Sequence, residues 1–358
     1  MSEYEKLLKY RPPNVEKKLA GTKILLLNSQ PIFQAILDLP IIVMACNIRI
    51  RHTIPGILRA SRELESIVAF ELAKSEGDID GGYTGQTPEI FVQTILEYVE
   101  GMNYSLPFII HGDHIKVKDT SEEEIESAKK LIQAEIEAGY SSFAIDASYN
   151  EIPDNIRITT ELAKPIIELG IGLEAEVGEI KALKEGGELT TVEEALEYIK
   201  GLNGNGVKPV LLATNNGSKH GNYAPGEEVH IDLERTRKIF KAVRPFGTAI
   251  AQHGITGTPL HLIGQFADYG IRKGNVGTQW QNIAHQGLPE DLFARMKKWA
   301  EENQKDIKFA TRVFKKEIDS IPEENKKKIE EMAYQEAKSL LKAFRSEGSA
   351  KKLLELLD

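Results

Sequence analysis

Eight short apolar runs, separated by longer amphipathic segments, constrain the fold of this chain more than any other feature. The runs are rich in Ile, Val, Leu and Ala and are bounded by Gly, Pro or charged residues, a pattern typical of strands buried on both faces. They cover residues 40–47, 66–72, 107–114, 142–148, 171–178, 209–216, 248–254 and 271–278. We therefore expect eight buried strands that alternate with the intervening segments.

The intervening segments carry apolar residues at spacings of three and four, which predicts helices. Two of them begin with a capping box, in which Ser121 precedes Glu124 and Thr191 precedes Glu194 by three residues. The predicted helices cover residues 53–64, 87–101, 121–139, 154–169, 191–204, 231–243 and 259–268.

This alternation predicts an α/β fold with a single (β/α)8 TIM barrel, because the strand count stops near eight and no Gly-rich nucleotide-binding motif follows a strand. An open, doubly wound sheet has the same alternation and is the alternative. We divide the chain into an N-terminal lead-in helix and strand (1–39, with the strand at Lys23–Leu27), a barrel catalytic domain (40–288) and a helical C-terminal extension (289–358).

Composition limits the partners and the metal sites that this chain could have. It has 358 residues, a formal net charge of −9 and one cysteine, Cys46. The charge gives no general attraction to nucleic acid or to a membrane surface, and one cysteine excludes an internal disulfide or a multi-cysteine zinc site. The apolar runs are too short to span a bilayer, and the charged N-terminus does not resemble a signal peptide. We expect a cytoplasmic protein that acts on a small molecule.

Polar and ionisable residues gather at the ends of the predicted strands, whereas the mid-strand positions are almost wholly apolar. The strand-end residues are Asn47, Glu71, His111, Asp113, His114, Asp146, Glu174, Glu176, Asn215, Asn216, His220, His253 and Asn275. Active sites of (β/α)8 barrels form where the C-terminal ends of the strands meet. The pattern therefore predicts a functional site at that end of the barrel.

Three histidines, His114, His220 and His253, lie at or just after the ends of three different strands. Because barrel strands converge, we expect their imidazoles to meet, and three imidazoles with a carboxylate or an open position form a common zinc site. Glu176 is the natural carboxylate partner. The other histidines fall in predicted helices or turns and receive no role; they are His52, His230, His261 and His285.

Two further features of the strand ends have two interpretations each. Asp113 precedes His114 and either transfers a proton at a metal-bound substrate or is simply a buried, hydrogen-bonded aspartate. The Gly-rich segments 220–226 and 253–257 follow late strands, where backbone N–H groups often bind phosphate. Ordinary tight turns use Gly equally well.

Five segments, taken together and in order, resemble the class II, metal-dependent fructose-bisphosphate aldolases. They read HGDH (111–114), EAEVG (174–178), HGNYAPG (220–226), HGITG (253–257) and RKGNVGTQW (272–280). The resemblance covers about residues 40–285. It implies a homo-oligomeric lyase of glycolysis and gluconeogenesis that reversibly cleaves fructose 1,6-bisphosphate to glycerone phosphate and glyceraldehyde 3-phosphate. It also implies an enediolate stabilised by Zn²⁺ or another divalent cation.

The resemblance assigns a role to each matching residue. His114, His220 and His253 are the implied metal ligands, with Glu176 as an additional or alternate one. Asp113 is the implied catalytic acid, and Glu188 is the implied base on a mobile loop, with Glu185 as its rival. The implied substrate-binding residues are Asn47, Gly221, Gly254, Thr256, Asn275 and Thr278. Asp146 and Glu174 are implied to support the metal ligands.

Three positions depart from the family pattern: Gly277 replaces an Asp, Ala224 stands where a basic residue is often found, and Glu71 stands where the second strand usually ends in a phosphate-binding Ser. A glutamate beside a phosphate would repel it. These departures concern the substrate rather than the metal, so another ketose phosphate, such as tagatose 1,6-bisphosphate, an unphosphorylated end, or a non-catalytic aldolase-like subunit stays open. The candidates for alternative phosphate contacts are Arg51, Arg272 and Lys273.

Overall fold

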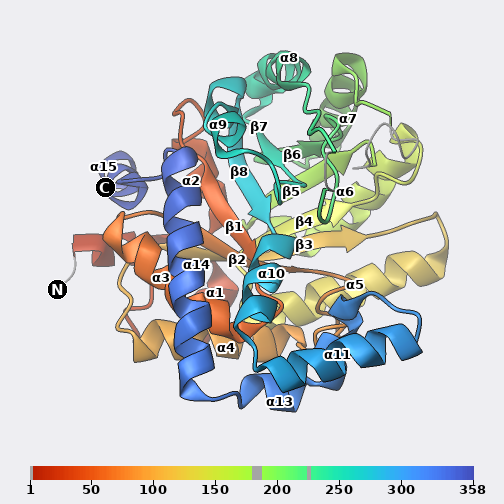
Figure 1. Cartoon of the computed structure of the whole chain (residues 1–358). Helices are drawn as coiled ribbons and strands as arrows, with labels where there is room; N and C mark the ends of the chain where they lie inside the picture. Colours follow the sequence, from red (N-terminus) through yellow and green to blue (C-terminus); the bar gives the residue numbers. More distant parts are fainter. Residues whose placement is uncertain (1–2, 180–187, 224–226) are drawn as a thin grey trace.

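A closed barrel of eight parallel strands forms the centre of the molecule (Figure 1). The computed structural model describes residues 3–179, 188–223 and 227–358. The strands are β1 (Val43–Asn47), β2 (Val68–Ala73), β3 (Phe108–Lys116), β4 (Ser142–Asp146), β5 (Gly172–Val177), β6 (Leu211–Thr214), β7 (Ala249–Gln252) and β8 (Ile271–Val276). They pair in chain order, and β8 pairs with β1, which confirms the barrel and excludes the open sheet.

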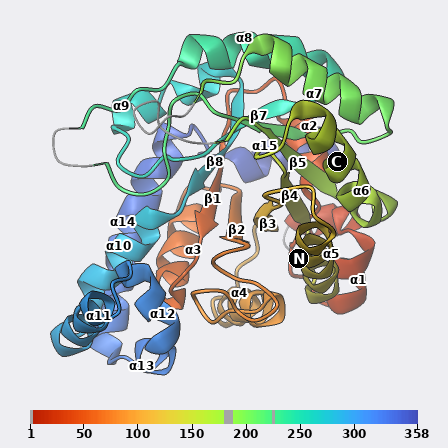
Figure 2. The same ribbon diagram turned by 90° about the vertical axis from the view of Figure 1, so that its right-hand side faces the viewer.

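Helices follow the strands and surround them, as Figures 1 and 2 show. They are α3 (Ile54–Glu63), α4 (Pro88–Gly101), α5 (Glu122–Ala138), α6 (Ile152–Glu168), α7 (Val192–Gly204), α8 (Leu233–Val243), α9 (Leu260–Ile263) and α10 (Thr278–Gly287). The helix predicted at 259–268 is instead divided between α9 and the 3-10 helix η5 (Phe266–Tyr269). Two shorter 3-10 helices, η2 (Arg51–Thr53) and η4 (Arg244–Phe246), join neighbouring elements.

The strands are almost entirely buried because helices cover their outer faces and the opposing strands fill the inside. Every residue of β1 and β5 is buried, and only Lys116, the last residue of β3, is partly exposed. The apolar runs therefore form strands buried on both faces, as the sequence predicts.

The N-terminal segment contains the 3-10 helix η1 (Glu3–Tyr10) and the helices α1 (Pro13–Lys18) and α2 (Ser29–Ala35). The strand predicted at Lys23–Leu27 is wrong, because this segment forms only a single parallel bridge, from Leu26 to Phe108. The barrel explains the difference. β3 pairs with β2 from Phe108 to Asp113 and with β4 only from His111 onward, so the free edge of β3 is short, and Leu26 meets it at Phe108 alone.

The C-terminal segment is helical and packs on the barrel. It consists of α11 (Glu290–Glu302), η6 (Ile307–Phe309), α12 (Ala310–Val313), α13 (Lys315–Asp319), α14 (Glu323–Ala343) and α15 (Ser349–Leu357). The long helix α14 crosses α3 so closely that a Cβ atom on Gly56 would lie 2.3 Å from the backbone oxygen of Glu330. Arg59 pairs with Glu330 at 3.1 Å and stacks over the ring of Tyr334.

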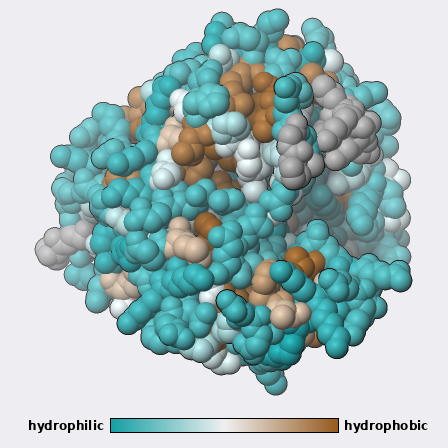
Figure 3. Space-filling view, viewed as in Figure 1, coloured by the Kyte–Doolittle hydropathy of each residue, from teal (hydrophilic) through white to brown (hydrophobic). Residues whose placement is uncertain are grey.

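The described helices include none that is both long and apolar enough to cross a membrane. The face of the molecule in Figure 3 is mostly hydrophilic, and its apolar residues gather in a few patches.

Candidate active site

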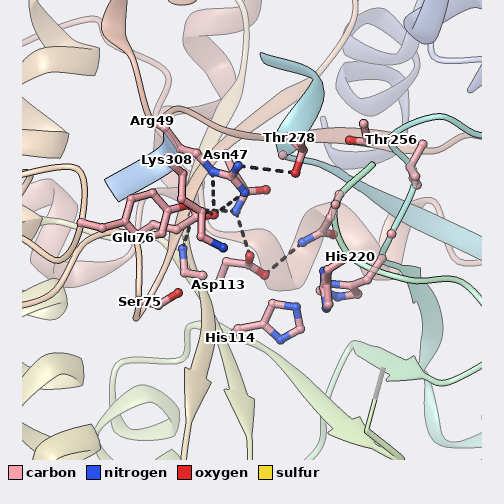
Figure 4. Close-up of a pocket in the computed structure, with 18 of the residues that line it drawn as sticks. Asn47, Arg49, Ser75, Glu76, Asp113, His114, His220, Thr256, Thr278 and Lys308 are labelled. Atoms are coloured by element: carbon pink, nitrogen blue, oxygen red, sulfur yellow. Dashed lines mark hydrogen bonds and ion pairs between the residues drawn. The ribbon is translucent and has the colours of Figure 1, made fainter. Parts of the chain in front are cut away.

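A cavity opens at the C-terminal ends of the barrel strands, where the sequence predicts a site (Figure 4). Its walls come from the ends of β1, β2, β3 and β8, from the loops that follow several strands, and from η6 of the C-terminal segment. The lining residues include Asn47, Arg49, Ala73, Ser75, Glu76, Tyr83, Asp113, His114, Lys116, His220, Gly221, His253, Gly254, Thr256, Asn275, Gly277, Thr278 and Lys308. Most residues predicted to bind metal or substrate are therefore brought together.

The three predicted imidazoles meet on one wall of this cavity. The ring centroids of His114 and His253 are 4.3 Å apart. The ring centroid of His220 lies 5.0 Å from that of His114 and 6.1 Å from that of His253. They come from β3 and from the loops after β6 and β7, so only closure of the barrel brings them together.

A local irregularity turns two consecutive side chains of β3 into the cavity. The sequence places His114 beyond the end of its strand, but β3 continues to Lys116, and its register with β4 shifts between Gly112 and Ile115. His114 has a φ of 41°, a left-handed conformation that is strained for a residue with a side chain. Alternation would send Asp113 and His114 to opposite faces, and this irregularity lets both line the cavity.

Two of these imidazoles each have one nitrogen atom held and one without a hydrogen-bond partner. The Nε2 atom of His253 lies 2.7 Å from Glu174 Oε1, and its Nδ1 atom is buried without a partner. The Nδ1 atom of His114 contacts Asp146 at 3.2 Å and Glu176 at 3.0 Å, and its Nε2 atom is buried without a partner. A carboxylate that fixes one ring nitrogen and leaves the other free is the usual arrangement around a divalent metal.

The donor set therefore fits a divalent cation. Asp113, His114 and His253 each offer a ligand atom within 4.8 Å of the others, and His114, Asp146 and Glu176 form a second such group. The structure places Glu176 beside Nδ1 of His114, together with Asp146, rather than in the first group. Nitrogen and carboxylate donors of this kind suit zinc and other divalent transition metals.

Asp113 lies at the centre of the cavity and is held by two amides. Asn47 Nδ2 donates to Oδ2 at 2.9 Å, and Asn275 Nδ2 donates to Oδ1 at 3.0 Å. Burial alone would raise the pKa of Asp113, but the positive charges of His114 and Lys273 outweigh it and lower the pKa. Both oxygen atoms of Asp113 accept a hydrogen bond, as those of an ionised carboxylate do. We call Asn47, Asp113, His114, His253 and Asn275 the pocket layer.

Beneath the pocket layer lies a buried layer of ionisable side chains, formed by Glu71, His111, Glu174 and Lys273. Lys273 Nζ lies 2.9 Å from Glu174 Oε2 and 3.2 Å from Glu71 Oε2, and these side chains are at most 1% exposed. His111 Nδ1 lies 2.7 Å from the hydroxyl of Ser142. His111 precedes Asp113 by two residues and Lys273 precedes Asn275 by two, so strand alternation places one layer below the other.

The environment sets the charges of the buried layer. Burial raises the pKa of Glu71, and Lys273 only partly opposes this effect. Burial would also raise the pKa of Glu174, but Lys273 and His253 outweigh it and lower the pKa. Burial lowers the pKa of His111 to about 3. The layer thus contains the close pair of Glu174 and Lys273, beside a carboxyl group whose pKa is raised and an imidazole whose pKa is lowered.

The buried layer corrects three expectations from the sequence. Mid-strand positions are not almost wholly apolar, because β2 continues to Ala73 and leaves Glu71 inside the barrel. Glu71 therefore does not line the cavity or face a phosphate there. The proposed phosphate contacts are also absent among the described lining residues: Lys273 is buried, Arg272 donates to backbone oxygen atoms including that of Ala267, and Arg51 pairs with Glu97.

One end of the cavity carries hydroxyl groups and glycines. Gly221, Gly254, Thr256 and Thr278 line it, as the resemblance implies. Gly254 has a φ of 68°, and a Cβ atom there would lie 2.5 Å from the backbone oxygen of Lys219, so the close turn requires glycine. This lining leaves room for a ligand close to the backbone.

Other predicted residues lie outside the cavity or outside the described residues. Glu188 is exposed and does not belong to the described residues that line the cavity. Glu185 and Ala224 lie outside the described residues. Asp146 and Glu174 lie behind His114 and His253, which they contact.

The other end of the cavity contains charged residues that the sequence did not single out. Arg49 pairs with Glu76, and Lys308 reaches the cavity from η6. A Cβ atom on Gly277 would lie 3.1 Å from Arg49 Nη2, so the guanidinium lies beside the position where the aldolase pattern has an aspartate. Arg49 and Glu76 are in loops after β1 and β2, and Lys308 is remote in sequence. No spacing rule could have associated the three.

Comparisons with known proteins agree with this geometry. A family model described as fructose-bisphosphate aldolase class II matches residues 28–349. The fructose-bisphosphate aldolase of Streptococcus pyogenes serotype M1 is 30% identical over 244 residues, which are 67% of this chain and 74% of that protein. The fructose-bisphosphate aldolase of Geobacillus stearothermophilus is 28% identical over 246 residues, 67% of this chain and 76% of that protein.

Two solved structures share the fold at low sequence identity. The YdjI aldolase of Escherichia coli K12 superposes with a TM-score of 0.63 and 21% identity, covering 91% of this chain and 99% of that one. The fructose-bisphosphate aldolase of Campylobacter jejuni superposes with a TM-score of 0.59 and 18% identity, covering 86% of this chain and 93% of that one. At these identities the likeness extends to the fold alone.

Proposed function

The chain belongs to the class II fructose-bisphosphate aldolase family, whose members are metal-dependent lyases, and from this premise we propose that it cleaves a phosphorylated ketose into glycerone phosphate and an aldehyde. The observation that carries the proposal is the pair of partnerless nitrogen atoms, His114 Nε2 and His253 Nδ1, beside the ionised Asp113. Fructose 1,6-bisphosphate, named in the relatives, is the reference substrate, with tagatose 1,6-bisphosphate as its alternative.

In this proposal the three imidazoles of His114, His220 and His253 hold the cation, and Glu176 is an additional or alternate ligand. A bound divalent cation supplies Lewis-acid stabilisation of negative charge on the substrate's oxygen atoms. Asp146 and Glu174 orient His114 and His253 through the ring nitrogens that face away from the cation.

Asp113 is the proposed acid–base residue for the hydroxyl group. During cleavage its carboxylate takes the proton of the hydroxyl β to the carbonyl as the carbon–carbon bond breaks, and the aldehyde forms. In the reverse direction it returns that proton. Asn47 and Asn275 hold the carboxylate in place and are proposed to contact the substrate. Glu188 stays the proposed base that exchanges a proton with carbon of the other fragment.

The hydroxyl-rich end of the cavity is the proposed binding place for the phosphate of glycerone phosphate. Thr256 and Thr278 supply hydroxyl groups, and Gly221 and Gly254 let the phosphate approach the backbone. Zinc as the metal, a homo-oligomeric assembly, a cytoplasmic location and a role in glycolysis and gluconeogenesis are further parts of this proposal, which the resemblance to the family implies.

The test is an assay of glycerone phosphate release from fructose 1,6-bisphosphate, tagatose 1,6-bisphosphate and fructose 1-phosphate, with the metal content of the protein measured in parallel. Chelation is expected to abolish cleavage and added Zn²⁺ to restore it. His114→Ala is expected to lower activity about a thousandfold and to release metal. His230→Ala, which removes an exposed histidine outside the site, is the matched control. Cleavage that persists after complete metal removal would refute the proposal.

A further inference from the structure

The cavity has two ends on opposite sides of Asp113, and their chemistry differs. In Figure 4, Thr256 and Thr278 lie on one side of Asp113, and Ser75, Glu76 and Lys308 lie on the other. The sequence and the fold together place the proposed proton-transfer group between the two ends. A ketose cleaved next to Asp113 must therefore extend into both, with its aldehyde half in the end that contains Glu76.

Glu76 places a fixed carboxylate at this second end. Its side chain is only 5% exposed. Oε1 lies 2.8 Å from Arg49 Nε and accepts from the hydroxyl of Tyr83 at 3.3 Å. Oε2 accepts from Asn47 Nδ2 at 3.0 Å and from the backbone N–H of Ala73 at 3.1 Å. To leave this end of the cavity, the carboxylate would have to give up all of these contacts.

Glu76 is also close to the proposed reaction centre. Asn47 Nδ2 donates to both Glu76 Oε2 and Asp113 Oδ2, so a single amide separates the two carboxylates. The groups that bind the aldehyde half therefore include a negative charge next to the cleaved bond.

The positive charge at this end is largely used by the protein itself. Arg49 contacts Glu76 Oε1 through Nη2 at 2.7 Å as well as through Nε. Its Nη1 donates to Gln281 at 2.7 Å and to the hydroxyl of Thr278 at 3.5 Å, so the guanidinium lies between the two ends. Lys308 lines the cavity without an ion pair to any described residue. A phosphate dianion is normally held by several cations or N–H groups. Here it would meet Lys308 and an Arg49–Glu76 pair whose charges offset each other, since the other lining lysine, Lys116, donates to the hydroxyl of Tyr149 at 3.1 Å.

We propose, on the basis of the aldolase function proposed above, that the aldehyde half of the substrate carries no phosphate. The substrate is then a ketose 1-phosphate whose phosphate lies at the Thr256 and Thr278 end. Its aldehyde half is a hydroxy aldehyde, whose hydroxyl groups meet Ser75, Tyr83 and Lys308. Glu76 is the specificity-determining residue, since it occupies the guanidinium of Arg49 and so leaves too little free positive charge at this end to hold a dianion, whereas neutral hydroxyl groups need none.

The first test uses the full-length, Zn²⁺-loaded protein in the direction of carbon–carbon bond formation. Glycerone phosphate is supplied with either D-glyceraldehyde or D-glyceraldehyde 3-phosphate, and kcat/KM is measured for each aldehyde. We expect at least a tenfold preference for D-glyceraldehyde. A preference for D-glyceraldehyde 3-phosphate would overturn the inference and leave the aldolase function standing. Failure to condense either aldehyde would instead overturn the aldolase function, and the inference with it.

The second test changes the charge of Glu76 with little change in shape. Glu76→Gln removes the carboxylate and frees the guanidinium of Arg49, so the ratio of kcat/KM for D-glyceraldehyde 3-phosphate to that for D-glyceraldehyde is expected to rise at least tenfold. Glu123→Gln, on the exposed face of α5, is the matched control and should leave the ratio unchanged. An unchanged ratio in folded Glu76→Gln would overturn the inference. If that variant does not fold, the comparison of aldehydes with the unaltered protein decides.

Discussion

The pocket layer and the buried layer share the strands β3 and β8, yet they hold their polar groups in different ways. In the pocket layer, His114 Nε2 and Asn275 Oδ1 lack a protein partner, and Asp113 stays ionised at the cavity wall. In the buried layer, Lys273 and Glu174 neutralise each other at 2.9 Å, and burial raises the pKa of Glu71. The buried layer also has atoms without a hydrogen-bond partner, both carboxyl oxygens of Glu71 and Nε2 of His111, but they do not line the cavity and so are not offered to a ligand there.

This difference teaches that polar residues inside one barrel serve two purposes. The buried layer costs desolvation energy, which the ion pair only partly offsets. It extends to the pocket layer through Glu174, which fixes Nε2 of His253 and leaves Nδ1 free. Substitutions in the pocket layer should therefore change activity, and those in the buried layer should change stability.

Asp113→Asn is expected to give the largest effect, because it removes the proposed proton acceptor from the pocket layer. We expect kcat for cleavage to fall by roughly 10²- to 10⁴-fold. The measurement is triose phosphate release, with metal content as the control for an intact metal site. A loss of less than tenfold would mean that Asp113 is not the acid–base residue.

Lys273→Met tests the buried layer, because it leaves the ionised Glu174 without its counter-charge. Removal of one partner of a buried pair costs about 3 kcal/mol of unfolding free energy, measured by urea denaturation. Lys241→Met, at an exposed position of α8, is the control and should change stability little. The double variant Lys273→Met/Glu174→Gln should recover part of the loss. If Lys273→Met lost no more unfolding free energy than Lys241→Met, Glu174 and Lys273 would not form an ionised pair.

Glu174→Gln tests the connection between the layers. A neutral amide is a weaker partner for His253 Nε2 than a carboxylate, so metal affinity or activity should fall by about 10- to 100-fold. Competition with a chelator of known affinity measures the metal affinity. Excess Zn²⁺ should restore part of the lost activity. Unchanged metal affinity and activity would show that Glu174 only balances the charge of Lys273.

Glu135→Gln is expected to give the smallest effect, since Glu135 lies outside both layers, on α5 behind β3. Burial raises the pKa of Glu135, and Asp78 and Asp113 add to the rise. Its folded pKa lies above its unfolded value, so the folded protein retains a proton that the unfolded chain releases, and stability falls as pH rises above about 4.5. Glutamine does not ionise.

From pH 5 to pH 6 the unfolding free energy of the unaltered protein should therefore fall by about 1 kcal/mol relative to that of Glu135→Gln. Urea denaturation at the two pH values measures it. A difference that does not change with pH would mean that Glu135 is ionised in the folded protein.

Much of the fold was predictable because local patterns and barrel closure agree. The eight apolar runs coincide with β1 to β8, and the capping boxes at Ser121 and Thr191 mark the starts of α5 and α7, where each side chain accepts from the backbone three residues on. The absence of a strand at Lys23–Leu27 was not predictable from its own residues, because whether an apolar segment joins a sheet depends on how much free edge the sheet offers it.

The metal-binding side of the site was also predictable, since parallel strands bring their ends to one edge and His114, His220 and His253 mark three of them. The sequence by itself determined the barrel, the three imidazoles and Asp113, because these depend on periodicity and strand order. Tertiary structure alone decided that Glu71 and Lys273 lie inside the barrel and that Arg49, Glu76 and Lys308 share one cavity end. Their proximity arises from strand length, loop paths and the packing of the C-terminal helices, which no local pattern encodes.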